Sequence, residues 1–167
     1  YQEPQPKRIY ELNNGKINIL YAPTFRNNFG TESFDLNFES CLKSLENRFG
    51  GEWVMLVRLH PNNLKEAATF ICYNDRVINA SSYSVMQELL VAADVLITDY
   101  SSCMFDFATT KKPCFLYATD IENYRQERDY YFELEELPFP LSQNNAELLD
   151  VISGFDSEKY NDDLGKL

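Results

Sequence analysis

The segment from Ala93 to Phe107, which reads ADVLITDYSSCMFDF, decides the fold. A short apolar run, Val95–Ile97, gives way to polar and hydroxyl-bearing residues, and an apolar pattern with helical spacing resumes at Met104. This order predicts a buried strand, a tight turn and a helix. Two hypotheses follow for Ser101 and Ser102 in the turn. They cap the helix, or together with the free N–H groups of the helix N-terminus they bind a phosphate.

Composition indicates a globular chain with one domain. Its 167 residues are 44% hydrophobic, enough for one proper core. The net charge of −11 argues against binding of nucleic acid or of an anionic membrane by this chain. Four scattered cysteines and a single histidine, without CxxC spacing, predict free thiols in a reducing compartment and no metal site. No apolar run approaches the roughly 18 residues of a membrane span.

Apolar runs and amphipathic stretches alternate along the chain. Strands are predicted at 17–21, 53–59, 77–79, 94–97 and 114–117, and helices within 34–48, 62–70, 81–93, 102–110, 122–128 and 145–154. Residues 129–142 are predicted to form a surface crossing. This alternation predicts an α/β fold with a doubly wound parallel sheet. We divide the chain into a linker or lead-in at 1–15, a nucleotide-binding domain at 16–155 and a polar C-terminal tail at 156–167.

The residues with useful chemistry share one edge of the predicted sheet. They are Thr24, Arg26, His60, Thr98, Asp99, Ser101 and Ser102, all at predicted carboxyl ends of strands. Ligands of parallel sheets bind at this edge, so the convergence favours the phosphate hypothesis for the turn. The chain has no G-x-G-x-x-G, P-loop or G-x-S-x-G motif, which argues against dinucleotide, ATP and hydrolase sites. A doubly wound sheet that binds a nucleotide without these motifs points to the nucleotide-binding half of a GT-B type transferase.

Three motifs resemble those of the CDP-glycerol glycerophosphotransferases of the teichoic-acid polymerase type. They are ILYAPTFR at 19–26, RLHPN at 58–62 and DVLITDYSS at 94–102, and Phe105-Asp106-Phe107, Lys112-Pro113, Tyr117, Asp120 and Tyr124 continue the pattern. The resemblance runs from about Ile17 to about Leu149. The block from Thr98 to Ser102 is highly specific, whereas the His-Pro dipeptide alone is weak.

The resemblance implies transfer of glycerol phosphate from CDP-glycerol to an acceptor hydroxyl of a teichoic-acid-like polymer, with release of CMP. It implies two GT-B domains, of which this chain matches the C-terminal, donor-binding one. The lipid-linked acceptor and the general base are then expected on an N-terminal domain outside this chain, which would bind donor but transfer poorly or not at all. The implied location is cytoplasmic and peripheral on the inner face of the membrane. CDP-glycerol is implied as donor substrate, and no cofactor is implied.

The resemblance also suggests roles for individual residues. His60, as imidazolium, would neutralise or protonate the departing phosphate, with a structural histidine of the loop as the alternative. Ser101 and Ser102 would hold the pyrophosphate, and Arg26 would clamp a phosphate or lie in solvent. Thr98 would add a hydroxyl, and Asp99 would orient a neighbour, contact a sugar hydroxyl or recruit a metal. The polyol end would be lined by Tyr117, Asp120, Tyr124 and Arg128, although both tyrosines could equally be core aromatics.

Other functions stay open at this point. Arg128 is followed by Asp129 where the family has glycine, and Pro138-Phe139-Pro140 replaces its Pro-Gly-Pro. A CDP-ribitol or other polyol phosphate donor is therefore an alternative. A GT-B glycosyltransferase that uses a UDP-sugar and a non-catalytic nucleotide-binding module are two further alternatives.

Overall fold

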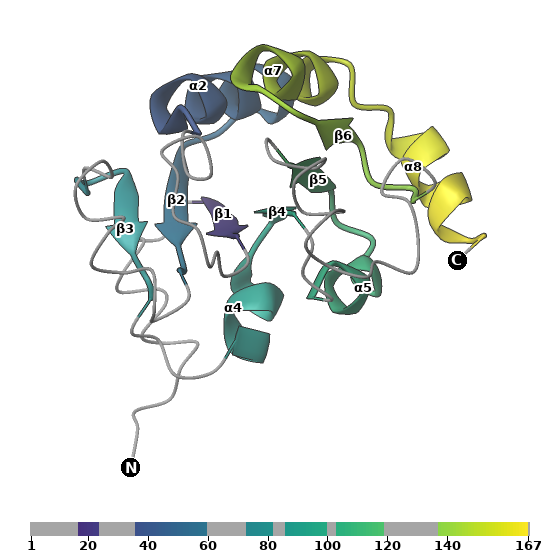
Figure 1. Cartoon of the computed structure of the whole chain (residues 1–167), viewed down its shortest axis with the longest axis horizontal. Helices are drawn as coiled ribbons and strands as arrows, with labels where there is room; N and C mark the ends of the chain where they lie inside the picture. The colour runs from purple at the N-terminus through teal and green to yellow at the C-terminus, as the bar shows by residue number, and fades with distance from the viewer. Residues whose placement is uncertain are drawn as a thin grey trace, which may run out of the picture.

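The computed structural model describes residues 17–23, 36–59, 73–81, 86–99, 103–118 and 137–166 (Figure 1). In chain order, its elements are β1 (Ile17–Ala22), α2 (Phe38–Phe49), β2 (Trp53–Val57), β3 (Val77–Asn79), α4 (Met86–Ala92), β4 (Val95–Thr98), α5 (Cys103–Ala108), β5 (Cys114–Tyr117), β6 (Leu141–Ser142), α7 (Asn145–Ser153) and α8 (Ser157–Leu164). The helices predicted at 62–70 and 122–128 and the lead-in at 1–15 lie outside the described residues.

Within this part of the chain, the strands form one parallel six-stranded sheet in the order β3-β2-β1-β4-β5-β6. The first strand, β1, pairs with β2 on one side and with β4 on the other, so the winding direction reverses between β1 and β4. In doubly wound sheets this reversal is the topological switch point, beside which ligands bind. The predicted doubly wound parallel sheet is confirmed.

Helices cover both faces of the sheet. Helices α2 and α7 lie side by side over one face, and α4 and α5 lie over the other (Figure 1). The side chains of Asn37 and Asn144 cap α2 and α7 by accepting from the N–H groups of Ser40 and Glu147. The backbone N–H of Asn37 donates to Oδ1 of Asn145 at 2.7 Å, which joins the starts of the two helices. Both helices therefore begin at the same edge of the sheet.

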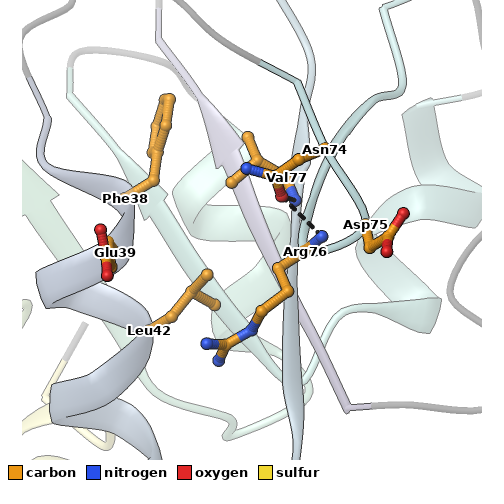
Figure 2. Close-up of a pocket in the computed structure, with 7 residues that line it drawn as sticks. All are labelled: Phe38, Glu39, Leu42, Asn74, Asp75, Arg76 and Val77. Atoms are coloured by element: carbon orange, nitrogen blue, oxygen red, sulfur yellow. Dashed lines mark hydrogen bonds between the residues drawn. The ribbon is translucent and has the colours of Figure 1, made fainter.

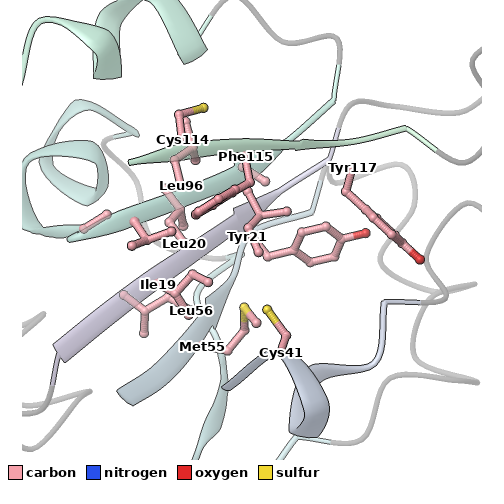
Figure 3. Packing of buried hydrophobic residues seen from close by; sticks show 14 of the residues in the cluster. Ile19, Leu20, Tyr21, Cys41, Met55, Leu56, Leu96, Cys114, Phe115 and Tyr117 are labelled. Carbon is pink, nitrogen blue, oxygen red and sulfur yellow. The ribbon is translucent and has the colours of Figure 1, made fainter. Parts of the chain in front are cut away.

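The core lies along the central strands, which carry apolar side chains toward both helix layers (Figure 3). Leu20 on β1 is paired in register with Leu56 on β2 and with Leu96 on β4, and all three are 0% exposed. Burial of one leucine side chain contributes about 1.5–3 kcal/mol. Continuous apolar runs such as Trp53–Val57 are buried on both faces, as expected for a parallel sheet between two helix layers.

The turn between α2 and β2 requires its two glycines. Gly50 and Gly51 have φ of +77° and +85°, which side-chain-bearing residues rarely adopt. A Cβ at position 51 would also lie 2.5 Å from Cδ1 of Ile17, so the Ile17 side chain would have to move. The N–H of Gly50 donates to the Glu46 carbonyl at 2.8 Å and ends the helix.

Polar contacts fix the amino end of the central strand pair. The backbone N–H of Asn18 donates to Oδ2 of Asp94 at 3.0 Å, and the Asp94 N–H donates to the Asn18 carbonyl at 2.9 Å. The Asn18 side-chain amide donates to the carbonyl of Ala92 at 3.0 Å. Lys112 Nζ donates to the carbonyl of Ala93 at 2.9 Å and so binds the end of α4. Because Asn18 is buried, these bonds hold β1 and the start of β4 in one register.

Two expectations about the C-terminal third are wrong. Part of the predicted crossing at 129–142 is strand β6, and Phe139 before it is buried. The segment 156–167, predicted to be a polar tail, contains α8, which Asp156 caps by accepting from the N–H groups of Glu158 and Lys159. One buried aromatic residue, Tyr160, docks this polar helix. Its ring lies 5.2 Å from that of Phe155, and its hydroxyl donates to the Lys112 carbonyl at 2.8 Å.

The helix predicted at 81–93 includes neither Ser81 nor Ala93. The helix predicted at 81–93 is described as α4 from Met86 to Ala92, and Ser81 lies in the turn after β3. A hydroxyl residue before an apolar pattern resembles a helix cap in sequence. Here the Ser81 hydroxyl bonds to the sheet instead.

Two cysteines of the described ranges lie in the core. Cys41 and Cys114 are free and fully buried. Burial raises the pKa of the Cys41 thiol to about 12, and burial, with a smaller effect of Cys103, raises the pKa of Cys114 well above its usual value. Both thiols are therefore protonated and unreactive at neutral pH. Among the helices described, none is long and apolar enough to span a bilayer.

Removal of the Tyr160 side chain should undock α8. We expect Tyr160→Ala to lower the free energy of unfolding by about 3–5 kcal/mol, as for other buried aromatics. Tyr160→Phe loses only the hydrogen bond to Lys112, about 1 kcal/mol. Lys159→Ala, at an exposed neighbouring position, is the control, with a change of about 0.5 kcal/mol or less. Urea denaturation measures all three, and equal values for Tyr160→Ala and Lys159→Ala would contradict the docking.

Candidate functional site

The candidate site is the edge at which the parallel strands end. Thr98 is the last residue of β4 and Asp99 follows it, while Tyr117 is the last residue of β5. Of the predicted site residues, these three lie in the described part of the chain. Thr24, Arg26, His60, Ser101, Ser102, Asp120, Tyr124 and Arg128 lie outside the described residues. In the sequence, Thr24 and His60 follow the ends of β1 and β2, and Ser102 immediately precedes α5.

Thr98 lies at the switch point itself. It is paired in register with Ala22, and its hydroxyl donates to the Ala22 carbonyl at 2.7 Å. The side chain is 1% exposed, so this bond is made in the interior. The hydroxyl thus holds together the ends of β1 and β4, the two strands at the switch point. A direct contact of Thr98 with a donor stays a prediction.

Asp99 and Tyr117 are buried, at 2% and 4% exposure. Asp99 is therefore not a solvated surface residue, and aspartates this buried are almost always paired. Tyr117 belongs to the hydrophobic cluster, and Figure 3 shows its ring on the same side of the sheet as Tyr21. The roles predicted for both residues stay predictions. Within the described ranges, no group of three His, Cys, Asp or Glu side chains lies close enough to hold a metal ion.

Two hydroxyls at this edge were missed by the sequence analysis. Ser142 on β6 is 0% exposed and donates to the Leu116 carbonyl of β5 at 2.9 Å. Ser81, after β3, donates to the Val57 carbonyl of β2 at 3.3 Å. Together with Thr98, they form three hydroxyl clips, each joining the end of one strand to that of its neighbour. A hydroxyl at the end of an apolar run is their only sequence signal, and many caps share it.

Arg58 is the first residue of the RLHPN motif, and no role in the site was predicted for it from the sequence. It follows β2, and its backbone N–H donates to the Tyr21 carbonyl at 2.9 Å, which places it beside the end of β1. The side chain is half-buried, and burial lowers the pKa of its guanidinium. Arginine still remains charged at neutral pH. Arg58 thus adds one cation near the carboxyl edge in a chain with a net charge of −11.

A separate cavity of about 670 Å³ lies on the flank of the sheet (Figure 2). Its walls are Phe38, Glu39 and Leu42 of α2 and the segment from Asn74 to Val77 at the start of β3. Figure 2 shows Asn74 accepting from the backbone N–H of Arg76 at 2.7 Å. Arg76 also forms an ion pair with Glu46. Because it adjoins the outermost strand, β3, this cavity is distinct from the switch point.

The sheet order is that of a Rossmann-like domain, the fold of the C-terminal half of GT-B type transferases. A family model described as CDP-Glycerol:Poly(glycerophosphate) glycerophosphotransferase matches residues 3–165. The chain belongs to this family. The resemblance inferred from the three sequence motifs is confirmed.

Curated relatives give the same result. The chain is 35% identical over 145 residues to the teichoic acid poly(ribitol-phosphate) polymerase of Bacillus spizizenii. It is 36% identical over 148 residues to the teichoic acid poly(glycerol phosphate) polymerase of Bacillus subtilis. These alignments cover 86% and 85% of this chain but only 23% and 19% of the relatives. The chain thus spans about a fifth of their length.

A solved structure of the wall teichoic acid polymerase TagF has the same fold. It is 30% identical, superposes with a TM-score of 0.72, and is matched over 96% of this chain and 40% of its own. A histidine-to-asparagine variant of that enzyme, soaked with CDPG for 30 minutes, superposes with a TM-score of 0.70. It is 29% identical and is matched over 97% of this chain and 40% of its own.

The Thr98 clip should stabilise the switch point. Thr98→Val keeps the shape of the side chain and removes the donor to the Ala22 carbonyl, so we expect a loss of about 1–3 kcal/mol in the free energy of unfolding. Thr98→Ser keeps the hydroxyl and should lose about 1 kcal/mol for the buried methyl group. The control is Thr109→Val, because the exposed Thr109 hydroxyl donates to the Asp106 carbonyl within one helix end. Wild-type stability of Thr98→Val in urea would contradict the clip.

Proposed function

We propose that this chain is the donor-binding domain of a transferase that moves glycerol phosphate from CDP-glycerol to a hydroxyl of a teichoic-acid-like polymer. The observation that carries the proposal is the family match over residues 3–165, which includes the whole carboxyl edge of the sheet. The CDPG soak of the TagF variant supports a CDP-polyol donor for a relative of the same fold. The donor is the substrate, and the proposal requires no cofactor.

In the proposed reaction, the acceptor oxygen attacks the glycerol-bearing phosphorus of CDP-glycerol. The bond from that phosphorus to the bridging oxygen breaks, and CMP leaves with the bridging oxygen. Ser101 and Ser102 bind the pyrophosphate, Arg26 clamps it, and Thr98 holds the crevice in shape. His60 as imidazolium neutralises or protonates the leaving phosphate. Catalysis consists of positioning and electrostatic stabilisation, as in other phosphoryl transfers.

The acceptor hydroxyl loses its proton to a base that we place on a second domain. These two polymerases are about four to five times longer than the matched segment, which leaves room for such a domain. The chain alone is therefore proposed to bind donor but to transfer poorly or not at all. The lipid-linked polymer acceptor binds through the second domain, and the complete transferase lies on the cytoplasmic face of the membrane as a peripheral protein.

A CDP-ribitol donor is the second candidate, because one relative with 35% identity is a poly(ribitol-phosphate) polymerase. The two donors differ only in the polyol. Asp120, Tyr124, Arg128 and Tyr117 are the residues that we assign to the polyol end. They, and not the phosphate-binding serines, would decide between the two donors.

Donor binding tests the proposal directly. Calorimetric titration of the chain with CDP-glycerol, CDP-ribitol, CMP and UDP-glucose should show binding of the cytidine ligands and none of UDP-glucose. Replacement of both Ser101 and Ser102 by alanine should weaken CDP-glycerol binding roughly 10- to 100-fold, the effect of losing hydrogen bonds to a charged group. Ser153→Ala, on the outer helix α7, is the matched control with unchanged affinity. Binding of UDP-glucose without a response to cytidine ligands would refute the proposal.

Turnover tests the role of His60. In the complete transferase, His60→Ala should lower kcat by about 10²–10⁴-fold, the usual contribution of a general acid. The affinity for CDP-glycerol should change far less, because the serines and Arg26 hold the donor. The readouts are CMP release at saturating donor and calorimetry on the same variant. Turnover at the wild-type rate would show that His60 is structural.

A further inference from the structure

Ser81 binds the end of β2 through both functions of its hydroxyl. Its Oγ donates to the Val57 carbonyl at 3.3 Å and accepts from the Leu59 N–H at 3.0 Å. The Val57 carbonyl also accepts from the Ala80 N–H at 2.8 Å. The Ser81 clip therefore differs from those at Thr98 and Ser142, for which the structure gives a hydroxyl that donates to one carbonyl.

Ser81 is itself held in place by its surroundings. Its backbone N–H donates to Oδ1 of Asn79 at 3.0 Å, which forms a tight turn directly after β3. Ala80 between them is 2% exposed. The hydroxyl is thus presented to β2 from a fixed backbone and not from a free loop.

The bond to Leu59 fixes the last residue before His60. Leu59 is 2% exposed, so its side chain is anchored in the core while its amide is bound by Ser81. Two independent restraints therefore hold Leu59 in place. His60 is the next residue in the sequence.

Loss of the hydroxyl would affect the two partners unequally. The Val57 carbonyl would keep the Ala80 N–H as a donor. The Leu59 N–H would lose the Ser81 acceptor, and a buried donor without an acceptor reorients toward another one. The expected consequence is a small loss of stability together with a displaced backbone at Leu59.

We propose that Ser81 is a positioning residue for His60. The inference rests on the proposed function in one respect, because His60 matters for transfer only if the chain binds a CDP-polyol donor. Ser81 does not touch the donor in this account. It acts through the Leu59 amide, and a displacement of about 1 Å at a catalytic group can cost about 100-fold in rate.

The single histidine makes the proposal measurable without activity. The chain contains one imidazole, so a carbon–proton correlation spectrum gives one histidine Cε1–H signal for the whole protein. We expect Ser81→Ala to shift this signal and Ser81→Thr, which retains the γ-hydroxyl, to restore it. Ser142→Ala, which removes a clip between β5 and β6, is the matched control and should leave the histidine signal unchanged. Circular dichroism verifies that each variant is folded.

Titration of the same samples with CDP-glycerol separates the two ideas. If the donor does not bind the wild-type chain, the proposed function fails, whatever Ser81 does. If the donor binds and Ser81→Ala leaves the histidine signal at its wild-type position, the positioning role is refuted. Should Ser81→Ala not fold, Ser81→Cys, with a weaker hydrogen-bonding group of similar size, serves for the same comparison and should give a smaller shift.

In the complete transferase, Ser81→Ala should lower kcat roughly tenfold or more and leave the KM for CDP-glycerol within about twofold, because only the catalytic group is displaced. Ser81→Thr should recover most of the rate. A loss that appears in KM alone, or that Ser81→Thr does not rescue, would contradict positioning through the hydroxyl.

Discussion

The pairing of β1 with β4 is the constraint on which the rest of the structure depends. These strands are far apart in the sequence, and the winding direction of the sheet reverses between them. Their pairing is fixed at the amino end by the reciprocal bonds of Asn18 and Asp94 and at the carboxyl end by the Thr98 hydroxyl. Slippage by one residue would break both ends and would also remove Leu20 from its row with Leu96. The ends of β1 and β4 at the switch point are therefore held in one register.

Much of this fold is predictable from the sequence because each central strand is a short, strongly apolar run of consecutive residues. The run from Trp53 to Val57 and that from Val95 to Ile97 need no partner to be recognised. By contrast, β6 has two residues and follows a proline-rich stretch, so no periodicity can develop. Helix α8 is polar apart from Tyr160 and Leu164, and Tyr160 packs on an aromatic cluster distant in sequence, a tertiary effect that local propensity does not contain.

The candidate site likewise has a part that the sequence predicts and a part that depends on tertiary structure. That hydroxyl residues gather at the carboxyl edge follows from strand order in the chain, and the sequence analysis predicted this for Thr98. Which carbonyl each hydroxyl reaches depends on which strands are neighbours, and β4 lies beside β1 only because the sheet is doubly wound. Ser81 shows the limit most clearly. In sequence it resembles the cap of the following helix, whereas in the structure it bonds to β2.

The three clips suggest how one edge can serve both stability and binding. Each parallel strand ends in carbonyl groups that the ladder no longer satisfies, and buried carbonyls need donors. Thr98, Ser81 and Ser142 donate to such carbonyls of the neighbouring strands, although the Val57 carbonyl also accepts from the Ala80 N–H. A hydroxyl used in this way is no longer free to donate to a phosphate. The residues for which we propose anion contacts follow the clips in the sequence. Ser101 and Ser102 come after Thr98, and His60 comes after Leu59, whose amide Ser81 binds.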